Sequence, residues 1–158
     1  EIKKKIKSKL FINVQGDEPL IEVKNLRKFI SIALKNKNQI CIGKSLINKN
    51  KYDNENIPKI VTNEKDELLY ISRSTVPGSK NKKDYKIYGQ VNVYSFPKVL
   101  LINKMFNKKS KNEEIEDIEI LRFLEHGYKI KVINLKSNNH AVDIPADIKI
   151  VEKILKKI

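Results

Sequence analysis

The chain has 158 residues, of which 40% are hydrophobic and 33% charged, a composition typical of one globular domain with a single core. No apolar run approaches the length of a membrane span, no secretory signal is visible, and the one cysteine, Cys41, gives neither a disulfide framework nor a metal cluster. We therefore expect a cytoplasmic protein with no membrane span.

The net charge of +14 at pH 7 favours anionic partners, such as nucleotides, sugar acids or nucleic acid. A bias of composition toward lysine and asparagine, with the lysines on solvated faces, explains the same charge. Arginine is rare among the 33 basic residues, so Arg73 and Arg122 stand out as candidates where a bidentate contact is needed.

Apolar runs with strand and helix periodicity follow one another along most of the chain. The basic, amphipathic stretch 1–10 resembles the tail of a preceding helix, so we expect native residues before Glu1. The expected elements are a strand at 11–15, a helix at 21–35, a strand at 39–47, a hairpin with strands at 57–62 and 68–73, a strand at 85–96, helices at 97–106 and 113–126, a strand at 128–135 and a helix at 145–158.

This order predicts an α/β fold in which a mixed, mainly parallel sheet is flanked by helices, within a single domain over 1–158. The consecutive strands at 57–62 and 68–73 break the alternation and indicate an antiparallel extension of the sheet. The last helix is expected to face the core with Ile148, Val151, Ile154, Leu155 and Ile158.

The stretch 11–20 is the one around which the other elements are arranged. Its strand stops at a glycine and a proline, and so places Asp17 and Glu18 at the carboxyl end. Ligands bind at that edge of an open α/β sheet, where two acids could hold a hard cation or a phosphate-bound metal. An ordinary surface turn with solvated acids fits the same residues equally well.

Asp143 is the natural partner of Asp17, because both follow a strand and a turn and can meet at one edge of the sheet. Two converging carboxylates repel each other unless a cation lies between them, and Mg²⁺ takes one or two protein carboxylates together with phosphate oxygens and water. The alternative is that Asp143 caps the helix that begins at Pro145.

Two further sites carry candidate binding groups. Arg73 ends a strand, where a guanidinium can clamp a carboxylate through two hydrogen bonds or form a structural salt bridge. Glu116 and Glu119 are three residues apart, on one face of the expected helix 113–126. A solvated acidic face is the alternative for this helix, and the stronger one for Glu113 and Glu114.

Five segments resemble, in order and spacing, motifs of the 3-deoxy-manno-octulosonate cytidylyltransferase family. The first is Asn-Val-Gln-Gly-Asp-Glu-Pro-Leu at 13–20, and the last is Ala-Val-Asp-Ile-Pro-Ala-Asp at 141–147, where the family has a Gly-Val-Asp-Thr-Pro-Glu-Asp-like motif. Between them lie similar segments at 70–77, 89–97 and 113–122. The resemblance covers nearly the whole chain but only the later part of the family's length.

The resemblance implies a nucleotide-diphospho-sugar transferase-like fold and a cytidylyltransferase that couples CTP to a 2-keto-3-deoxy sugar acid for lipopolysaccharide synthesis. It implies Mg²⁺ as cofactor, held by the catalytic residues Asp17 and Asp143, and a homodimer formed through the extension at 57–94. The implied contacts are Gln15 to CTP, and Arg73, Gln90, Tyr94 and Glu119 to the sugar acid.

The chain departs from the family's motifs at Gln90, Asn92, Pro97 and Ile120. We expect these changes to fall together in the sugar pocket and to alter the acceptor. Two other interpretations stay open: a catalytically silent relative, and a basic α/β module that binds nucleic acid. The second is disfavoured because aromatic residues do not cluster among the basic ones.

Overall fold

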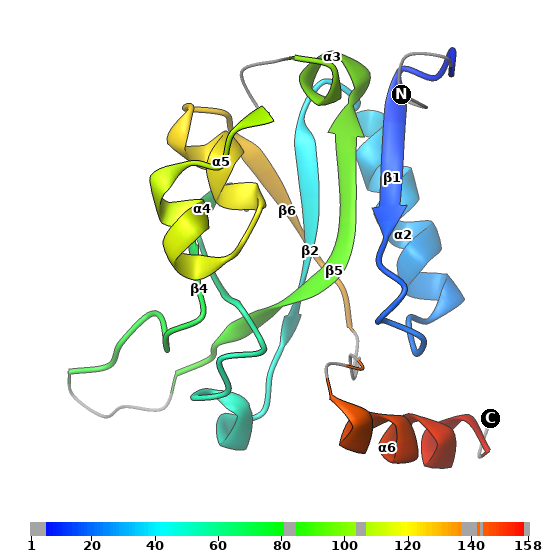
Figure 1. The fold of residues 1–158 in the computed structure, drawn as a ribbon, viewed down its shortest axis with the longest axis vertical. Coiled ribbons are helices and arrows are strands. Elements are labelled where there is room, and N and C mark those ends of the chain that lie inside the picture. Colours follow the sequence, from blue (N-terminus) through cyan, green and yellow to red (C-terminus); the bar gives the residue numbers. More distant parts are fainter. Residues whose placement is uncertain (1–5, 81–84, 104–106, 137–141, 143, 157–158) are drawn as a thin grey trace.

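The computed structural model describes residues 6–80, 85–103, 107–136, 142 and 144–156. Within this part of the chain, six strands form one sheet: β1 (Leu10–Val14), β2 (Ile40–Leu46), β3 (Lys59–Thr62), β4 (Leu68–Ser72), β5 (Tyr88–Pro97) and β6 (Ile130–Asn134) (Figure 1). The helices are α2 (Val23–Lys35), α3 (Lys98–Leu101), α4 (Lys111–Glu116), α5 (Ile120–Glu125) and α6 (Pro145–Leu155), with a 3-10 turn η1 (Lys49–Lys51).

The long strand β5 organises the sheet. One edge of β5 pairs with β2, and its other edge is shared by β3, opposite Tyr88 and Gly89, and by β1, opposite the last five residues. The strand order is β4-β3-β5-β2-β6, with β1 beside the second half of β5. The end of β1 therefore lies directly beside the middle of β5.

The open, mixed sheet flanked by helices is confirmed, but the expectation of a mainly parallel sheet is wrong. Among the described strands only β2 and β6 pair in parallel, and the other four pairings are antiparallel. The connection from β3 to β4 consists of residues 63–67 only, and β3 lies between β4 and β5 and pairs with both. A short connection joins antiparallel neighbours, whereas a parallel neighbour needs a long crossover.

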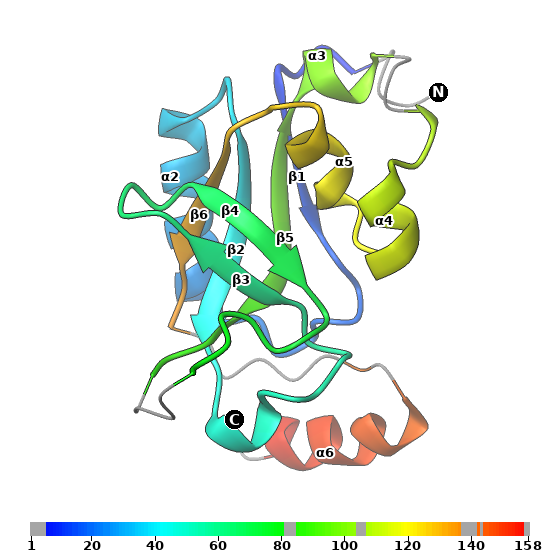
Figure 2. The same ribbon diagram turned by 90° about the vertical axis from the view of Figure 1, so that its left-hand side faces the viewer.

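Helices cover both faces of the sheet, which Figure 2 shows with α2 on one side and α4 and α5 on the other. The alternation of β5 separates two cores, because successive side chains of a strand point to opposite faces. The α2 side contains Phe29, Ala33, Cys41, Val91, Val93, Ile133 and Leu135. The α4–α5 side contains Ile40, Ile42, Ile60, Leu68, Ile71, Leu100, Ile118, Ile120, Leu121, Phe123, Ile130 and Val132.

The β3–β4 hairpin is antiparallel, as expected, and it folds back against its own sheet. The amide of Val132 donates to the carbonyl of Asp66 at 2.8 Å, and Lys44 Nζ lies 3.3 Å from Asp66 Oδ1. Ile60 and Ile71 of the hairpin are buried in the core. The hairpin therefore stabilises the fold of its own chain.

The expected helix 113–126 is broken in two. Its two parts, α4 and α5, are separated at Asp117, which has left-handed backbone angles of φ 50° and ψ 48°. The preceding helix, expected at 97–106, is the short α3, and residues 104–106 lie outside the described part.

The last helix, α6, does not face the core as expected. Val151 is buried, but Ile148, Ile154 and Leu155 are 49%, 36% and 50% exposed, and Ile158 lies outside the described residues. Figures 1 and 2 place α6 beyond one end of the sheet. None of the described helices combines the length and the apolar character that crossing a membrane requires.

Candidate active site

The turn after β1 holds the residues of the first motif against β5. The amide of Gln15 donates to the carbonyl of Asn92 at 3.1 Å, which extends the β1–β5 ladder by one residue. The amide of Glu18 then donates back to the carbonyl of Gln15 at 3.3 Å, and Glu18 Oε1 accepts from the amide of Asn92 at 3.3 Å. Glu18 is only 5% exposed, so it fixes the turn, and Asp17 between these contacts is held at the strand end.

One side-chain oxygen of Asp17 is buried at the end of β1. Its Oδ1 is buried and has no hydrogen-bond partner among the described residues. A buried polar atom without a partner costs about 1–3 kcal/mol, and so it indicates a ligand that is bound during function. A carboxylate oxygen suits a hard cation such as Mg²⁺, which fits the first interpretation of this turn.

The fold brings the last motif to the first one. The amide of Val142 donates to the carbonyl of Asp17 at 2.8 Å, although 125 residues separate the two in sequence. Asp143 itself lies outside the described residues. The residue at the N-cap of α6 is Ile144, whose amide donates to Asp147 Oδ2 at 3.0 Å. A described carboxylate therefore already caps this helix, which weakens capping as the role of Asp143.

The side chains of Gln90, Asn92 and Tyr94 belong to one face of β5, because they alternate along the strand. Nε2 of Gln90 donates to the hydroxyl of Tyr94. Burial raises the pKa of Tyr94 well above its ordinary value, and the nearby charges of Glu119, Asp17 and Glu18 raise it further. Tyr94 therefore keeps its proton at neutral pH and acts as a hydrogen-bonding group, not as a base.

Two of the predicted site residues are in contact, Gln90 and Tyr94 on β5, and the charges of Glu119, before α5, and Asp17, after β1, act on Tyr94. The main chain of Gln15 is hydrogen-bonded to Asn92 of β5, two residues from Tyr94. The sequence interpretation missed Asn13, which is directly opposite Tyr94 in the β1–β5 ladder and so shares its face. Its position two residues before Gln15 in the same strand was the available signal.

Arg73 makes contacts to the main chain instead. Its Nε donates to the carbonyl of Glu116 at 2.6 Å, and its two terminal nitrogens donate to the carbonyls of Glu55 at 3.0 Å and Asp117 at 3.3 Å. These contacts give Arg73 a structural role, although through main-chain carbonyls and not through the salt bridge that was the alternative in the sequence. The clamp on a substrate carboxylate stays a prediction.

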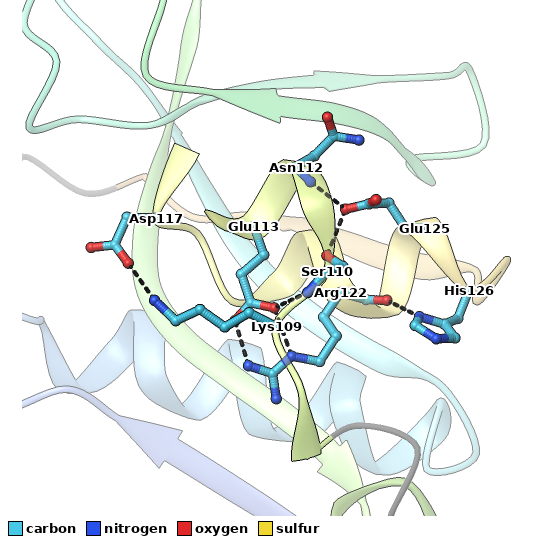
Figure 3. Close-up of polar contacts among 8 residues, drawn as sticks. All are labelled: Lys109, Ser110, Asn112, Glu113, Asp117, Arg122, Glu125 and His126. Atoms are coloured by element: carbon cyan, nitrogen blue, oxygen red, sulfur yellow. Dashed lines mark hydrogen bonds and ion pairs between the residues drawn. The ribbon is translucent and has the colours of Figure 1, made fainter. Parts of the chain in front are cut away.

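The helix pair α4–α5 contains a buried ion pair that Figure 3 shows. Glu113 is 1% exposed, and Arg122 Nε donates to its Oε2 at 2.6 Å. Burial alone would raise the pKa of Glu113, but hydrogen bonds from Arg122 and from the Ser110 amide outweigh burial and lower it. The solvated acidic face expected at Glu113 is therefore wrong. His126 Nδ1 lies 2.7 Å from the carbonyl of Arg122, at the end of α5.

The departures from the family's motifs do not all fall together, so that expectation is wrong. Ile120 is 1% exposed within the core, and Pro97 alternates onto the opposite face of β5 from Gln90. Gln90 and Asn92 do lie beside Tyr94. Any change of acceptor therefore rests on these two positions.

Comparisons with known proteins agree with the motifs. The profile of the family described as "Cytidylyltransferase" matches residues 1–132. The 3-deoxy-manno-octulosonate cytidylyltransferase of Thermodesulfovibrio yellowstonii is 34% identical over 156 residues, 94% of this chain and 61% of the relative. The 8-amino-3,8-dideoxy-manno-octulosonate cytidylyltransferase of Shewanella sediminis is 31% identical over 149 residues, 92% of this chain and 61% of the relative.

Among solved structures, a CMP:2-keto-3-deoxy-manno-octonic acid synthetase in complex with CTP shares the fold, with a TM-score of 0.90. It is 24% identical, and the match covers 99% of this chain and 65% of that one. The chain spans about three fifths of the length of the curated relatives it matches, at 61% for both relatives above.

Proposed function

Because the chain belongs to the cytidylyltransferase family, we propose that the protein transfers cytidylate from CTP to a 2-keto-3-deoxy sugar acid. The relatives named above act on 3-deoxy-manno-octulosonate or its 8-amino-3,8-dideoxy form, so the proposed acceptor is a sugar acid of this class. The family membership confirms the resemblance seen in the motifs. Activity, substrates and partners are proposals, because the chain spans 61% of these relatives.

The proposed reaction is a nucleotidyl transfer. The anomeric hydroxyl oxygen of the sugar acid forms a bond to the α-phosphorus of CTP, and the bond from that phosphorus to the β-bridging oxygen breaks. Pyrophosphate leaves, and the proton of the hydroxyl passes to solvent. Catalysis by the protein then consists mainly of holding the two reactants in line.

The observation that carries this proposal is the state of Asp17. Its Oδ1 is buried without a hydrogen-bond partner among the described residues, and its carbonyl is joined to Val142, the neighbour of Asp143 in sequence. Asp17 and Asp143 would hold Mg²⁺, which would neutralise charge on the phosphates. The main-chain position of Gln15 beside this turn supports its proposed contact to CTP.

The acceptor would be held by neutral and acidic groups on the α4–α5 face of the sheet. Tyr94 retains its proton and is hydrogen-bonded by Gln90, so it can donate to a sugar hydroxyl. Glu119 is exposed at the start of α5, where its carboxylate can accept from another hydroxyl. The homodimer and the cytoplasmic location expected from the sequence belong to the same proposal.

The test is direct observation of the products. The purified protein is incubated with CTP, MgCl₂ and 3-deoxy-manno-octulosonate or its 8-amino-3,8-dideoxy form, and phosphorus NMR detects pyrophosphate and the CMP-sugar. We expect product formation that Asp17→Asn abolishes. Binding of both substrates without turnover would support the silent relative instead, and failure to bind either substrate would overturn the proposal.

A further inference from the structure

The break between α4 and α5 lies next to the candidate site and is held from outside the helices. Asp117 has a left-handed backbone, a conformation that aspartate adopts more readily than most residues with a Cβ atom but less readily than glycine. Neither glycine nor proline, the residues that most often end a helix, occurs between 110 and 126. Tertiary contacts to the break can therefore contribute to its stability.

Arg73, directly after the end of β4, supplies such contacts. Its guanidinium donates to the carbonyls of Glu116 and Asp117, the last carbonyls before and within the break, at 2.6 and 3.3 Å. These carbonyls have lost the helical amides that would normally bind them. Lysine cannot replace this contact, because its single nitrogen lacks the planar fork that reaches several acceptors in fixed directions.

Glu116 completes the connection in the opposite direction. Its carboxylate accepts from Ser72 Oγ at 2.6 Å and from the amide of Arg73 at 2.8 Å. Behind Arg73, the fully buried Lys59 donates from Nζ to the carbonyls of Arg73 at 2.5 Å and Asn54 at 2.7 Å. Hydrogen bonds thus hold both the main chain of Arg73 and its guanidinium in place.

The break decides where Glu119 lies. In an unbroken helix Glu116 and Glu119 would share one face, as the sequence predicts, and both would turn toward β4. In the structure Glu116 accepts from Ser72 of β4, whereas Glu119 lies between Ile118 and Ile120, which are buried in the core cluster against which Tyr94 of β5 packs. The two carboxylates therefore serve different strands only because the helix is broken between them.

We propose that Arg73 is a positioning residue, which holds the α4–α5 break through the carbonyls of Glu116 and Asp117 and so keeps Glu119 beside Tyr94. Arg73 then acts on the acceptor through Glu119 and does not itself bind a substrate carboxylate. This inference rests on the proposed function, in which Glu119 contacts the sugar acid.

The experiment compares Arg73→Ala, Arg73→Lys and the double variant Arg73→Ala/Asp117→Gly with the unmodified protein. Arg27→Ala, on the exposed side of α2, is the matched control. One measurement is hydrogen exchange of the Leu121 and Arg122 amides, which bind the carbonyls of Ile118 and Glu119 at 3.1 and 3.2 Å. The other is the dissociation constant for 3-deoxy-manno-octulosonate, with that for CTP measured alongside.

We expect Arg73→Ala and Arg73→Lys to accelerate exchange of both amides and to weaken sugar-acid binding about tenfold, with CTP binding unchanged. Glycine adopts left-handed angles without the Cβ penalty, so Asp117→Gly should restore most of both properties in the Arg73→Ala background. It removes only an exposed ion pair with Lys109, which contributes little to stability.

A direct substrate clamp gives a different pattern and would overturn the inference: sugar-acid binding falls, amide exchange stays unchanged, and Asp117→Gly restores nothing. Unchanged exchange and binding in Arg73→Ala would overturn it as well. If exchange responds and is rescued as expected but the unmodified protein binds no sugar acid, the proposed function fails while the role of Arg73 in the break stands.

Discussion

Replacement of Asp17 by asparagine tests whether this carboxylate lowers the free energy of unfolding in the absence of its ligand. Its Oδ1 is buried without a hydrogen-bond partner among the described residues, which costs about 1–3 kcal/mol. Glu18, the next residue of the turn, is a second acid and is only 5% exposed, so two adjacent carboxylates lie at the end of β1. A neutral amide of the same shape places one charge fewer there. We therefore expect Asp17→Asn to raise the free energy of unfolding by about 1 kcal/mol without metal.

Magnesium should reverse the order of stability. A ligand that binds only the folded protein at a hundred times its dissociation constant adds about 2.7 kcal/mol, or roughly 5–10 °C in Tm for a chain of this size. We expect this gain in the unmodified protein, with MgCl₂ alone or with CTP, and its loss in Asp17→Asn. Urea and thermal denaturation at several MgCl₂ concentrations measure both effects.

The exposed Asp53 provides a matched control, since its Oδ1 accepts a hydrogen bond from Thr75 Oγ1 at 2.6 Å. Asp53→Asn should change stability by less than about 0.5 kcal/mol and keep the magnesium response. Two outcomes would refute the reasoning about Asp17: a metal-free Asp17→Asn that is destabilised by more than about 1 kcal/mol, or an unmodified protein that magnesium does not stabilise under any of these conditions.

Three further predictions concern the ion pair and the acceptor. Arg122→Met should lower the free energy of unfolding in urea by about 3 kcal/mol, because it leaves the buried Glu113 carboxylate unpaired, and Glu113→Gln in the same protein should recover part of it. The pKa of Glu113 is lowered in the folded protein, so its contribution is present above the ordinary value of 4.5 and is lost as the pH falls below it; Glu113→Gln should flatten that part of a stability–pH curve. Turnover with a panel of 2-keto acids should favour an acceptor other than unmodified octulosonate. Gln90→His should shift the preference toward octulosonate, and full activity of the unmodified protein on octulosonate would contradict this prediction.

Local sequence was sufficient for the elements and for much of the site. The alternation of β5, the amphipathic α2 and the turn at Gly16 each follow from residues within one element. The convergence of Asp17 with the segment before α6 also followed from the order of strands and turns, and the hydrogen bond from Val142 to Asp17 agrees with it. The expectation of a mainly parallel sheet was wrong because the order of helices and strands along the chain does not specify the edge of the sheet at which each strand pairs.

Long-range contacts explain what the sequence did not show. Neither glycine nor proline lies between Glu113 and His126, and the carbonyl of Asp117 at the break accepts from Arg73, 44 residues earlier. Glu113 is buried and pairs with Arg122 of α5, on the other side of the break. A periodicity argument treats each helix alone, so it assigned Glu113 to a solvated face together with Glu114, which is indeed exposed.

The charge of the site differs from the charge of the chain. The chain carries a net charge of +14, yet the charges that act on Tyr94 come from Glu119, Asp17 and Glu18. Arg73, the arginine expected to bind the carboxylate of the sugar acid, donates to main-chain carbonyl groups instead. Both proposed substrates are anions, and anions would be repelled by carboxylates at close range. A divalent cation between them removes this conflict, and so the acidic character of the site, more than any single residue, is the physical reason for proposing Mg²⁺ here.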